Sequence, residues 1–123
     1  MNRDMDVIRR IALRLRETDD ALSALDGVAD EAFNYNAQLM IEAGLADGSA
    51  VGSVHGKIGV PLSVCLFRLT WEGHDFADSI KDETLWEKAK EKVVKPTGSW
   101  TFGILKEFIK FEIKRRLGMG DGA

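Results

Sequence analysis

Phe67-Arg68-Leu69-Thr70-Trp71-Glu72-Gly73-His74-Asp75-Phe76 reads as a strand that turns directly into a helix. Residues 64–69 form a short apolar run rich in strand formers, which indicates a buried strand. Thr70 is a suitable N-cap, because its hydroxyl can accept a free backbone N–H of the first turn. Phe76 and Ile80 stand four residues apart and share one helix face. The stretch therefore predicts a corner, with a helix over residues 71–81.

Before this corner, the chain predicts two helices and a hairpin. Apolar residues recur at helical spacing over residues 4–17, where Asp4 or Asn2 would cap the start. A second helix is predicted over 29–43, with Gly44 as its stop and an apolar face formed by Tyr35, Leu39, Met40 and Ala43. Residues 21–28 between them read as a short strand or an extended link, with a turn at Asp26-Gly27. Residues 46–63 are rich in glycine and serine, which predicts two antiparallel strands joined by a long tip.

After the corner, two more helices are predicted. One covers residues 84–94 and ends before Pro96, since proline cannot continue a helix. Its inward residues are predicted to be Leu85, Trp86, Ala89 and Val93. The other helix runs from 99 to 117.

The apolar residues of this last helix spread over more of its circumference than one small core can cover. One side is predicted to pack on the domain through Phe102, Leu105, Ile109 and Ile113. The other side is predicted to form a homodimer through Trp100, Ile104, Phe108 and Phe111. Two alternatives stay open. The first is complete burial within the monomer, and the second is a membrane surface approached by the basic residues of this helix.

Length and charge restrict the class of protein. A chain of 123 residues is long enough for one core. The net charge of −3 argues against a surface that binds nucleic acid everywhere, although a local basic patch is compatible with it. Cys65 is the single cysteine, so no disulfide can form within the chain, and we expect a cytoplasmic location. The sequence shows no signal peptide and no apolar run long enough to span a membrane.

The order helix, link, helix, hairpin, helix is that of a winged helix. Three segments also carry a resemblance to a family of small bacterial and phage proteins, domain of unknown function 2513. They are residues 2–11, the run Glu42-Ala43-Gly44-Leu45, and residues 68–76 followed by Asp82-Glu83-Thr84-Leu85-Trp86. The resemblance spans most of residues 2–94 and is weaker over the last helix. It implies a winged-helix-like fold and supplies no established activity.

If the protein contacts DNA, three groups of residues are candidates. Arg9, Arg10 and Arg14 lie mainly off the apolar stripe of the first helix, where a solvated face is the simpler interpretation. Asn34, Asn36 and Gln38 are amides on the helix that would enter the major groove. Lys57 belongs to the predicted wing. However, the helix at 29–43 has no lysine or arginine and carries Asp30, Glu31 and Glu42, which disfavours contact with phosphates.

We expect no enzymatic activity, no metal and no cofactor. His74 and Asp78 form an i, i+4 pair, but two ligands do not make a metal site. We expect Cys65 to be a buried, inert thiol, because it lies in an apolar run without a neighbouring base.

The sequence therefore predicts an α+β winged helix-turn-helix with a small antiparallel β-hairpin and a C-terminal helical extension. The winged-helix-like part is expected over residues 1–94 and the dimerisation element over 95–123. The first functional hypothesis is a DNA-associated regulator or accessory factor in the cytoplasm, acting as a homodimer. The second is a protein–protein interaction module that keeps the fold and does not bind DNA.

Overall fold

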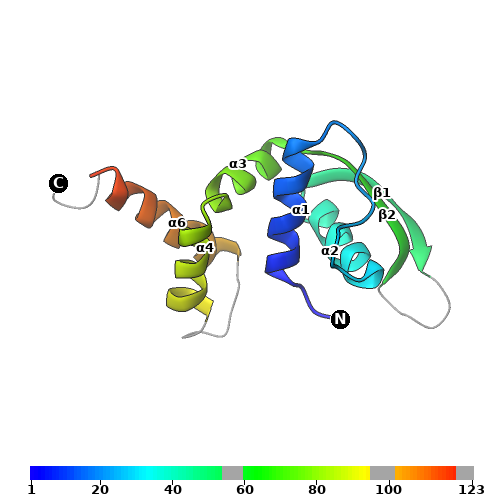
Figure 1. Ribbon diagram of the computed structural model, residues 1–123, viewed down its shortest axis with the longest axis horizontal. Coiled ribbons are helices and arrows are strands. Elements are labelled where there is room, and N and C mark those ends of the chain that lie inside the picture. Colours follow the sequence, from blue (N-terminus) through cyan, green and yellow to red (C-terminus); the bar gives the residue numbers. More distant parts are fainter. Residues whose placement is uncertain (54–59, 95–101, 119–123) are drawn as a thin grey trace. The chain divides into compact units, whose positions relative to one another are not determined.

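Helix α1 (Met5–Glu17) begins where Asp4 caps it, in the computed structural model shown in Figure 1. The Asp4 carboxylate accepts the backbone N–H groups of Asp6 and Val7, at 3.0 and 3.2 Å. The structure describes residues 1–53, 60–94 and 102–118. These residues group into two compact units, Met1–Ala77 and Asp78–Ala123.

In the first unit, α1 is followed by a link, helix α2 (Asp30–Glu42) and the strands β1 (Ala46–Ser53) and β2 (Pro61–Leu69). The strands pair antiparallel, from Ala46 opposite Leu69 to Ser53 opposite Pro61. The link is joined to the sheet where Leu22 and Leu66 exchange backbone hydrogen bonds of 2.8 Å. Of the two predictions for residues 21–28, the extended link is therefore confirmed, with a single β-bridge. The turn at Asp26-Gly27 is also confirmed, since Gly27 has a φ of 76°.

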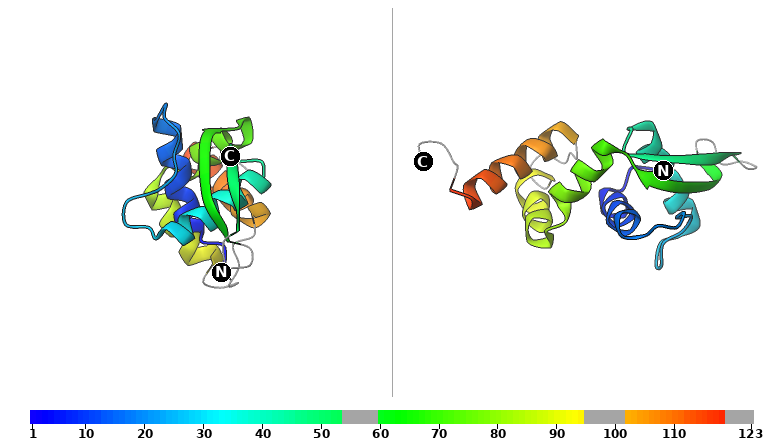
Figure 2. Two further views of the ribbon diagram at one scale, coloured as in Figure 1. Left: turned by 90° about the vertical axis from the view of Figure 1, so that its right-hand side faces the viewer. Right: turned by 90° about the horizontal axis from the view of Figure 1, so that it is seen from above.

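The core of the first unit lies between α1, α2 and one face of the hairpin (Figure 2). Its fully buried side chains include Ile11, Phe33, Ala37, Met40, Val64 and Leu66. For the second helix, we expected an apolar face of Tyr35, Leu39, Met40 and Ala43. Only Met40 of these four is fully buried, because α2 turns Phe33 and Ala37 toward the sheet instead.

The corner predicted from residues 67–76 is confirmed. Helix α3 (Trp71–Ile80) starts directly after Thr70, whose Oγ1 accepts the Gly73 N–H at 3.1 Å. The Thr70 hydroxyl also donates to the Gly44 carbonyl, and the Thr70 N–H donates to the Leu45 carbonyl at 3.0 Å. These bonds join the start of α3 to the end of α2.

Glycine is required on both sides of this junction. Gly44 ends α2 with a φ of 74°, a left-handed conformation that other residues adopt at a cost. Gly73 lies so close to the Leu45 carbonyl that a β-carbon would overlap its oxygen. The junction is therefore fixed by backbone contacts as well as by hydrogen bonds.

The second unit holds the end of α3, helix α4 (Glu83–Ala89), a five-residue π-helix η1 (Lys90–Val94) and helix α6 (Phe102–Arg116). The predicted inward residues Leu85, Trp86, Ala89 and Val93 are all buried, and Leu105 and Ile109 of α6 join them in the core. The helix expected over 84–94 is thus confirmed, with a change to π-helical bonding at Lys90.

The described residues therefore form an α+β fold of helices and a two-stranded antiparallel hairpin, as predicted. The predicted tip of the hairpin and residues 99–101 of the last predicted helix lie outside the described ranges. The division into residues 1–94 and 95–123 stays a prediction.

Candidate functional site

The arginines predicted to contact DNA lie on the outer side of α1. Arg10 and Arg14 are exposed, and Arg9 is half-buried. The Arg10 side chain is held in place, since its guanidinium donates a hydrogen bond of 2.8 Å to the Asp26 carbonyl. Arg14 therefore offers the more available charge of the two exposed side chains.

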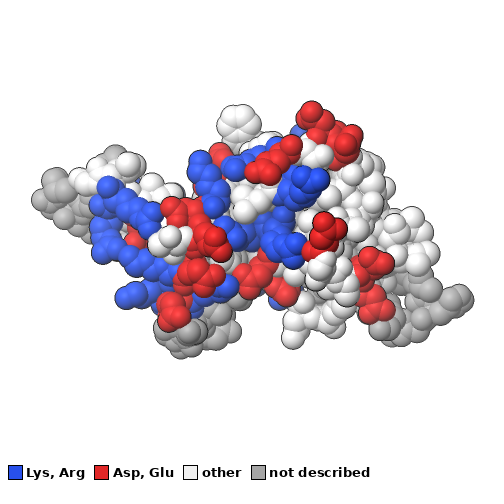
Figure 3. All heavy atoms as spheres, in the orientation of Figure 1, with Lys and Arg blue, Asp and Glu red and all other residues white. Residues whose placement is uncertain are grey.

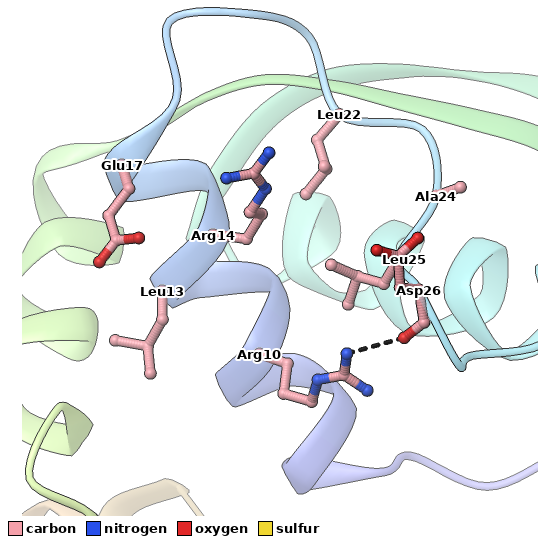
Figure 4. Close-up of a pocket in the computed structure, with 8 residues that line it drawn as sticks. All are labelled: Arg10, Leu13, Arg14, Glu17, Leu22, Ala24, Leu25 and Asp26. Atoms are coloured by element: carbon pink, nitrogen blue, oxygen red, sulfur yellow. Dashed lines mark hydrogen bonds between the residues drawn. The ribbon is translucent and has the colours of Figure 1, made fainter.

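A pocket lies between α1 and the link that follows it, and Arg10 and Arg14 form part of its wall (Figure 4). The rest of the wall consists of Leu13, Glu17, Leu22, Ala24, Leu25 and Asp26. Two carboxylates thus stand beside the two guanidinium groups, so the charge of the pocket is close to balanced. Figure 3 shows the same mixture more widely, with lysine and arginine interleaved with acidic residues on the face it displays. This arrangement does not form a uniform basic surface for a phosphate backbone.

Two of the amides predicted to read bases are inside the protein. Asn34 is 8% exposed, and its side chain bridges to β2: Nδ2 donates to the Leu62 carbonyl at 3.1 Å, and Oδ1 accepts the Val64 N–H at 3.2 Å. Asn36 is 1% exposed, and its Oδ1 accepts the Asp4 N–H at 2.8 Å. Both amides thus bond backbone groups of distant segments, and the Val64 N–H among these groups is buried. We therefore leave Asn34 and Asn36 out of any surface that could contact DNA.

The accessible side of α2 is acidic. Its half-exposed and exposed residues recur at steps of three and four, namely Glu31, Tyr35, Gln38 and Glu42. Gln38, the third predicted amide, is half-exposed, but it stands between carboxylates on a helix without lysine or arginine. Such a helix is repelled by phosphates and suits a neutral or basic partner surface. Lys57, the predicted wing residue, lies outside the described residues.

Large apolar side chains are exposed at the corner between β2 and α3. Trp71 is 81% exposed in the first turn of α3, and Phe67 is 52% exposed four residues earlier. The pairing of the strands is irregular here: Asp47 faces Arg68 and Gly48 faces Leu66, so Phe67 is the extra residue of a β-bulge. Bulges redirect side chains. Sequence reasoning used this stretch to place the corner and missed its exposed aromatic pair.

The residues predicted to form a dimer lie on α6. Ile104 is 46% exposed, Phe111 is 56% exposed and Phe108 is half-buried, while Trp100 lies outside the described residues. On the opposite side of α6, the prediction is confirmed for Leu105 and Ile109 and wrong for Ile113, which is 37% exposed. The side chain of Phe102 is not among those described.

Glu112 takes the place in the core that was predicted for Ile113. It is 5% exposed, and its Oε2 accepts hydrogen bonds from Lys88 and Arg115, each at 2.9 Å. The hydrogen bond from Lys88 is the main reason that the pKa of the Glu112 carboxyl lies below its usual value. Its position three residues after Ile109, on the buried face, was the signal that sequence reasoning passed over.

The candidate chemical groups are dispersed. His74 and Asp78 are both exposed on α3. Within the described ranges, no three histidine, cysteine or acidic residues come together as metal ligands would. Cys65 is half-buried rather than buried as predicted, because it lies on the strand face opposite the core residues Val64 and Leu66. Within the described part of the chain, no helix has both the length and the apolar character to cross a membrane.

Comparisons with known proteins agree with the resemblance found in the sequence. A family model described as hypothetical protein, domain of unknown function 2513, matches residues 2–99. An uncharacterised protein of Haemophilus influenzae is 30% identical over 98 residues, which cover 76% of this chain and 79% of that protein. No solved structure matches. The family match ends before α6.

Proposed function

The chain belongs to the hypothetical-protein family called domain of unknown function 2513, and we propose that it is a winged-helix-like module that binds another protein. It is not an enzyme in this proposal. The binding surface is the corner where β2 meets α3.

The winged-helix part of the proposal is supported by the order of elements in the first unit. Helix α1, the bridge at Leu22, helix α2 and the β1–β2 hairpin stand in the chain order of a first helix, first strand, recognition helix and wing, but α2 is the one helix between the bridge and the hairpin, where a helix-turn-helix has two. The bridge between Leu22 and Leu66 supplies the position of a first strand. Fold alone assigns no function, so the partner has to be argued from the surfaces.

The burial and charge of the α2 side chains favour a protein partner over DNA bases. Asn34 and Asn36 are both buried and hydrogen-bonded to backbone groups of other segments. The accessible residues that remain include Glu31 and Glu42, and α2 contains no lysine or arginine. A major-groove helix needs cations near the phosphates and donors toward the bases.

The single observation that carries the proposal is the exposure of Trp71 at a rigid corner. Thr70, Gly73 and Leu45 hold the first turn of α3 by the backbone contacts described above. The backbone that carries the indole is thus already ordered before a partner binds, and Phe67 adds a second aromatic ring four residues earlier in the chain. Tryptophan in such a position is a typical anchor of protein interfaces.

The test compares Trp71→Ala with Leu62→Ala in cells that express the tagged full chain. Leu62 is a matched control, because it is 55% exposed and lies at the other end of β2. We expect quantitative mass spectrometry to find a partner retained by the wild type and by Leu62→Ala, and depleted at least about tenfold with Trp71→Ala. Equal melting temperatures would show that both variants fold. A partner set that is the same for all three proteins would contradict the proposal.

A second candidate, a DNA-associated regulator, is favoured by one observation: α1 exposes Arg10 and Arg14. It would contact phosphates through α1 and not read bases through α2. A mobility shift with duplex DNA at low salt, repeated at higher salt, tests it, because phosphate contacts weaken steeply with salt. Arg14→Ala should reduce the salt slope by about 1, whereas Lys81→Ala, an exposed change outside α1, should not. An absence of any shift at low salt would remove this candidate.

A further inference from the structure

Helix α6 has a second apolar face, which is partly exposed, besides the one that it buries in the core. Leu105, Ile109 and Glu112 face the core of the second unit. The other face carries Ile104, Phe108 and Phe111, which we call the α6 stripe. Two of its residues are about half-exposed, at 46% for Ile104 and 56% for Phe111.

The spacing of the α6 stripe is that of a helix–helix seam. Its residues follow one another at steps of four and three, and a further step of four leads to Arg115. Alternating steps of three and four keep residues in one line along a helix that packs against another helix. The seam therefore consists of three apolar positions and, at its C-terminal end, an arginine.

We propose that the α6 stripe packs against the α6 stripe of a second copy of the chain, with the two helices antiparallel. In this arrangement Phe108 lies against Phe111 of the partner subunit, and Ile104 lies against the methylene groups of Arg115 of the partner subunit. Both contacts occur twice, because a two-fold axis passes between the helices. Arg115 can supply apolar stem while its guanidinium stays at the edge, where it already bonds Glu112 at 2.9 Å.

The charges beside the stripe select the antiparallel direction. Glu107 and Lys114 are exposed and flank the same side of the seam. When two such helices run antiparallel, each Glu107 stands next to Lys114 of the partner subunit, which gives two attractive pairs. When they run parallel, Arg115 meets Arg115 of the partner subunit, and Glu107 has no lysine of the partner subunit beside it. The meeting of the two arginines disfavours the parallel pair.

This proposal is independent of the protein partner proposed for the β2–α3 corner. It concerns a helix outside the family match, which ends at residue 99, whereas α6 begins at Phe102. Helices of fifteen residues make a small interface, so we expect a weak dimer that dissociates on dilution.

The experiment is sedimentation equilibrium of the full chain over a range of concentrations. We expect a monomer–dimer equilibrium for the wild type and a monomer for Phe111→Lys, a change at an exposed position that leaves the fold intact. Lys110→Glu is the matched control: it is also an exposed charge change on α6, but it lies away from the seam, so the dimer should persist. A monomeric wild type at every concentration, or a Phe111→Lys variant that dimerises as the wild type does, would overturn the proposal.

The effect of one further variant on the dissociation constant distinguishes antiparallel from parallel helices. In the antiparallel dimer, Glu107→Lys replaces two attractive pairs by two repulsive ones and should raise the dissociation constant about tenfold. Glu107→Lys combined with Lys114→Glu restores the opposite charges and should recover most of the wild-type affinity. In a parallel dimer, Glu107 has no lysine of the partner subunit to lose, so a Glu107→Lys variant that dimerises as tightly as the wild type would overturn the antiparallel arrangement.

Discussion

Glu112 on α6 accepts a hydrogen bond of 2.9 Å from the Lys88 ammonium on α4, and this ion pair joins the two helices inside the second unit. The carboxylate is 6% exposed at its side chain, whereas Lys88 is 32% exposed. Arg115 shares the same oxygen. A buried acid held by two partly solvated cations stabilises the packing of α6 as long as it stays ionised.

Replacement of this acid should weaken the second unit. We expect Glu112→Gln to lower the free energy of opening of α4 and α6 by about 1–2 kcal/mol, because two charge-assisted bonds become neutral ones at a partly solvated site. Hydrogen exchange of the α4 and α6 amides measures this energy. Glu87→Gln is the matched control. Its pair with Lys90 is exposed, so its effect should stay within about 0.5 kcal/mol. Equal effects of the two changes would contradict a structural role for Glu112.

Acid should weaken the same unit. The pKa of Glu112 lies below its usual 4.5, chiefly because of the hydrogen bond from Lys88, and the pKa of Asp82 lies below 3.8, chiefly because Asp82 accepts the Leu85 N–H. For both groups the unfolded chain binds the proton more readily than the folded one. The stability that the two ionised groups contribute is therefore fully present at a pH above their unfolded pKa values. It is lost as the pH falls through their lowered pKa values in the folded chain.

The measurement is hydrogen exchange or chemical denaturation of the wild type and of Glu112→Gln between neutral pH and pH 3. The glutamine does not titrate, so the variant should lose less stability over this range than the wild type. An identical acid dependence of the two proteins would show that the ionisation of Glu112 does not contribute.

The contact of Gly73 with Leu45 predicts an unusual response to alanine. Gly73→Ala should destabilise the first unit by about 1–3 kcal/mol or more, because its methyl group would overlap a backbone oxygen that cannot move without shifting the end of α2. Gly103→Ala, with open space around the added carbon, should instead stabilise α6 by about 0.5–1 kcal/mol through helix propensity. Urea denaturation of both variants tests the contrast. A neutral Gly73→Ala would mean that the corner is not held by close backbone contact.

The Asn34 amide offers a test that separates structure from DNA recognition. Asn34→Ala removes the acceptor of the buried Val64 N–H and should lower the free energy of unfolding by about 1–3 kcal/mol. Gln38→Ala, on the accessible side of the same helix, should change it by no more than about 0.5 kcal/mol. Thermal unfolding measures both. If Asn34→Ala kept full stability and lost DNA binding instead, the assignment of Asn34 to the interior would be wrong.

Local signals in the sequence were sufficient for the elements of the fold. The Asp4 cap, the Gly44 stop and the Thr70 cap each act through the few residues beside them, and each prediction is confirmed. The run at 64–69 is a strand as predicted, but it buries only one face, since Phe67 and Arg68 are exposed. The choice between a strand and a link at 21–28 stayed open, because the hydrogen bonds that Leu22 exchanges with Leu66 join residues far apart in the chain.

The surfaces were predicted less well, for a physical reason. Asparagine is polar, so Asn34 and Asn36 were expected outside, but they are buried where strand and cap backbone groups need partners. On α6, Ile113 and Glu112 are neighbours in the chain. Glu112 is the buried one of the two, and it pairs there with Lys88 of α4, which is distant in the sequence.

The helices, the hairpin, the strand-to-helix corner and the family could be predicted from the chain alone, because capping, periodicity and glycine stops are properties of short segments. Which polar groups are buried and which aromatic rings reach solvent became known only from the packing of the folded chain. Those outcomes depend on groups brought together from distant parts of the chain, as Asn34 meets Val64 and Glu112 meets Lys88.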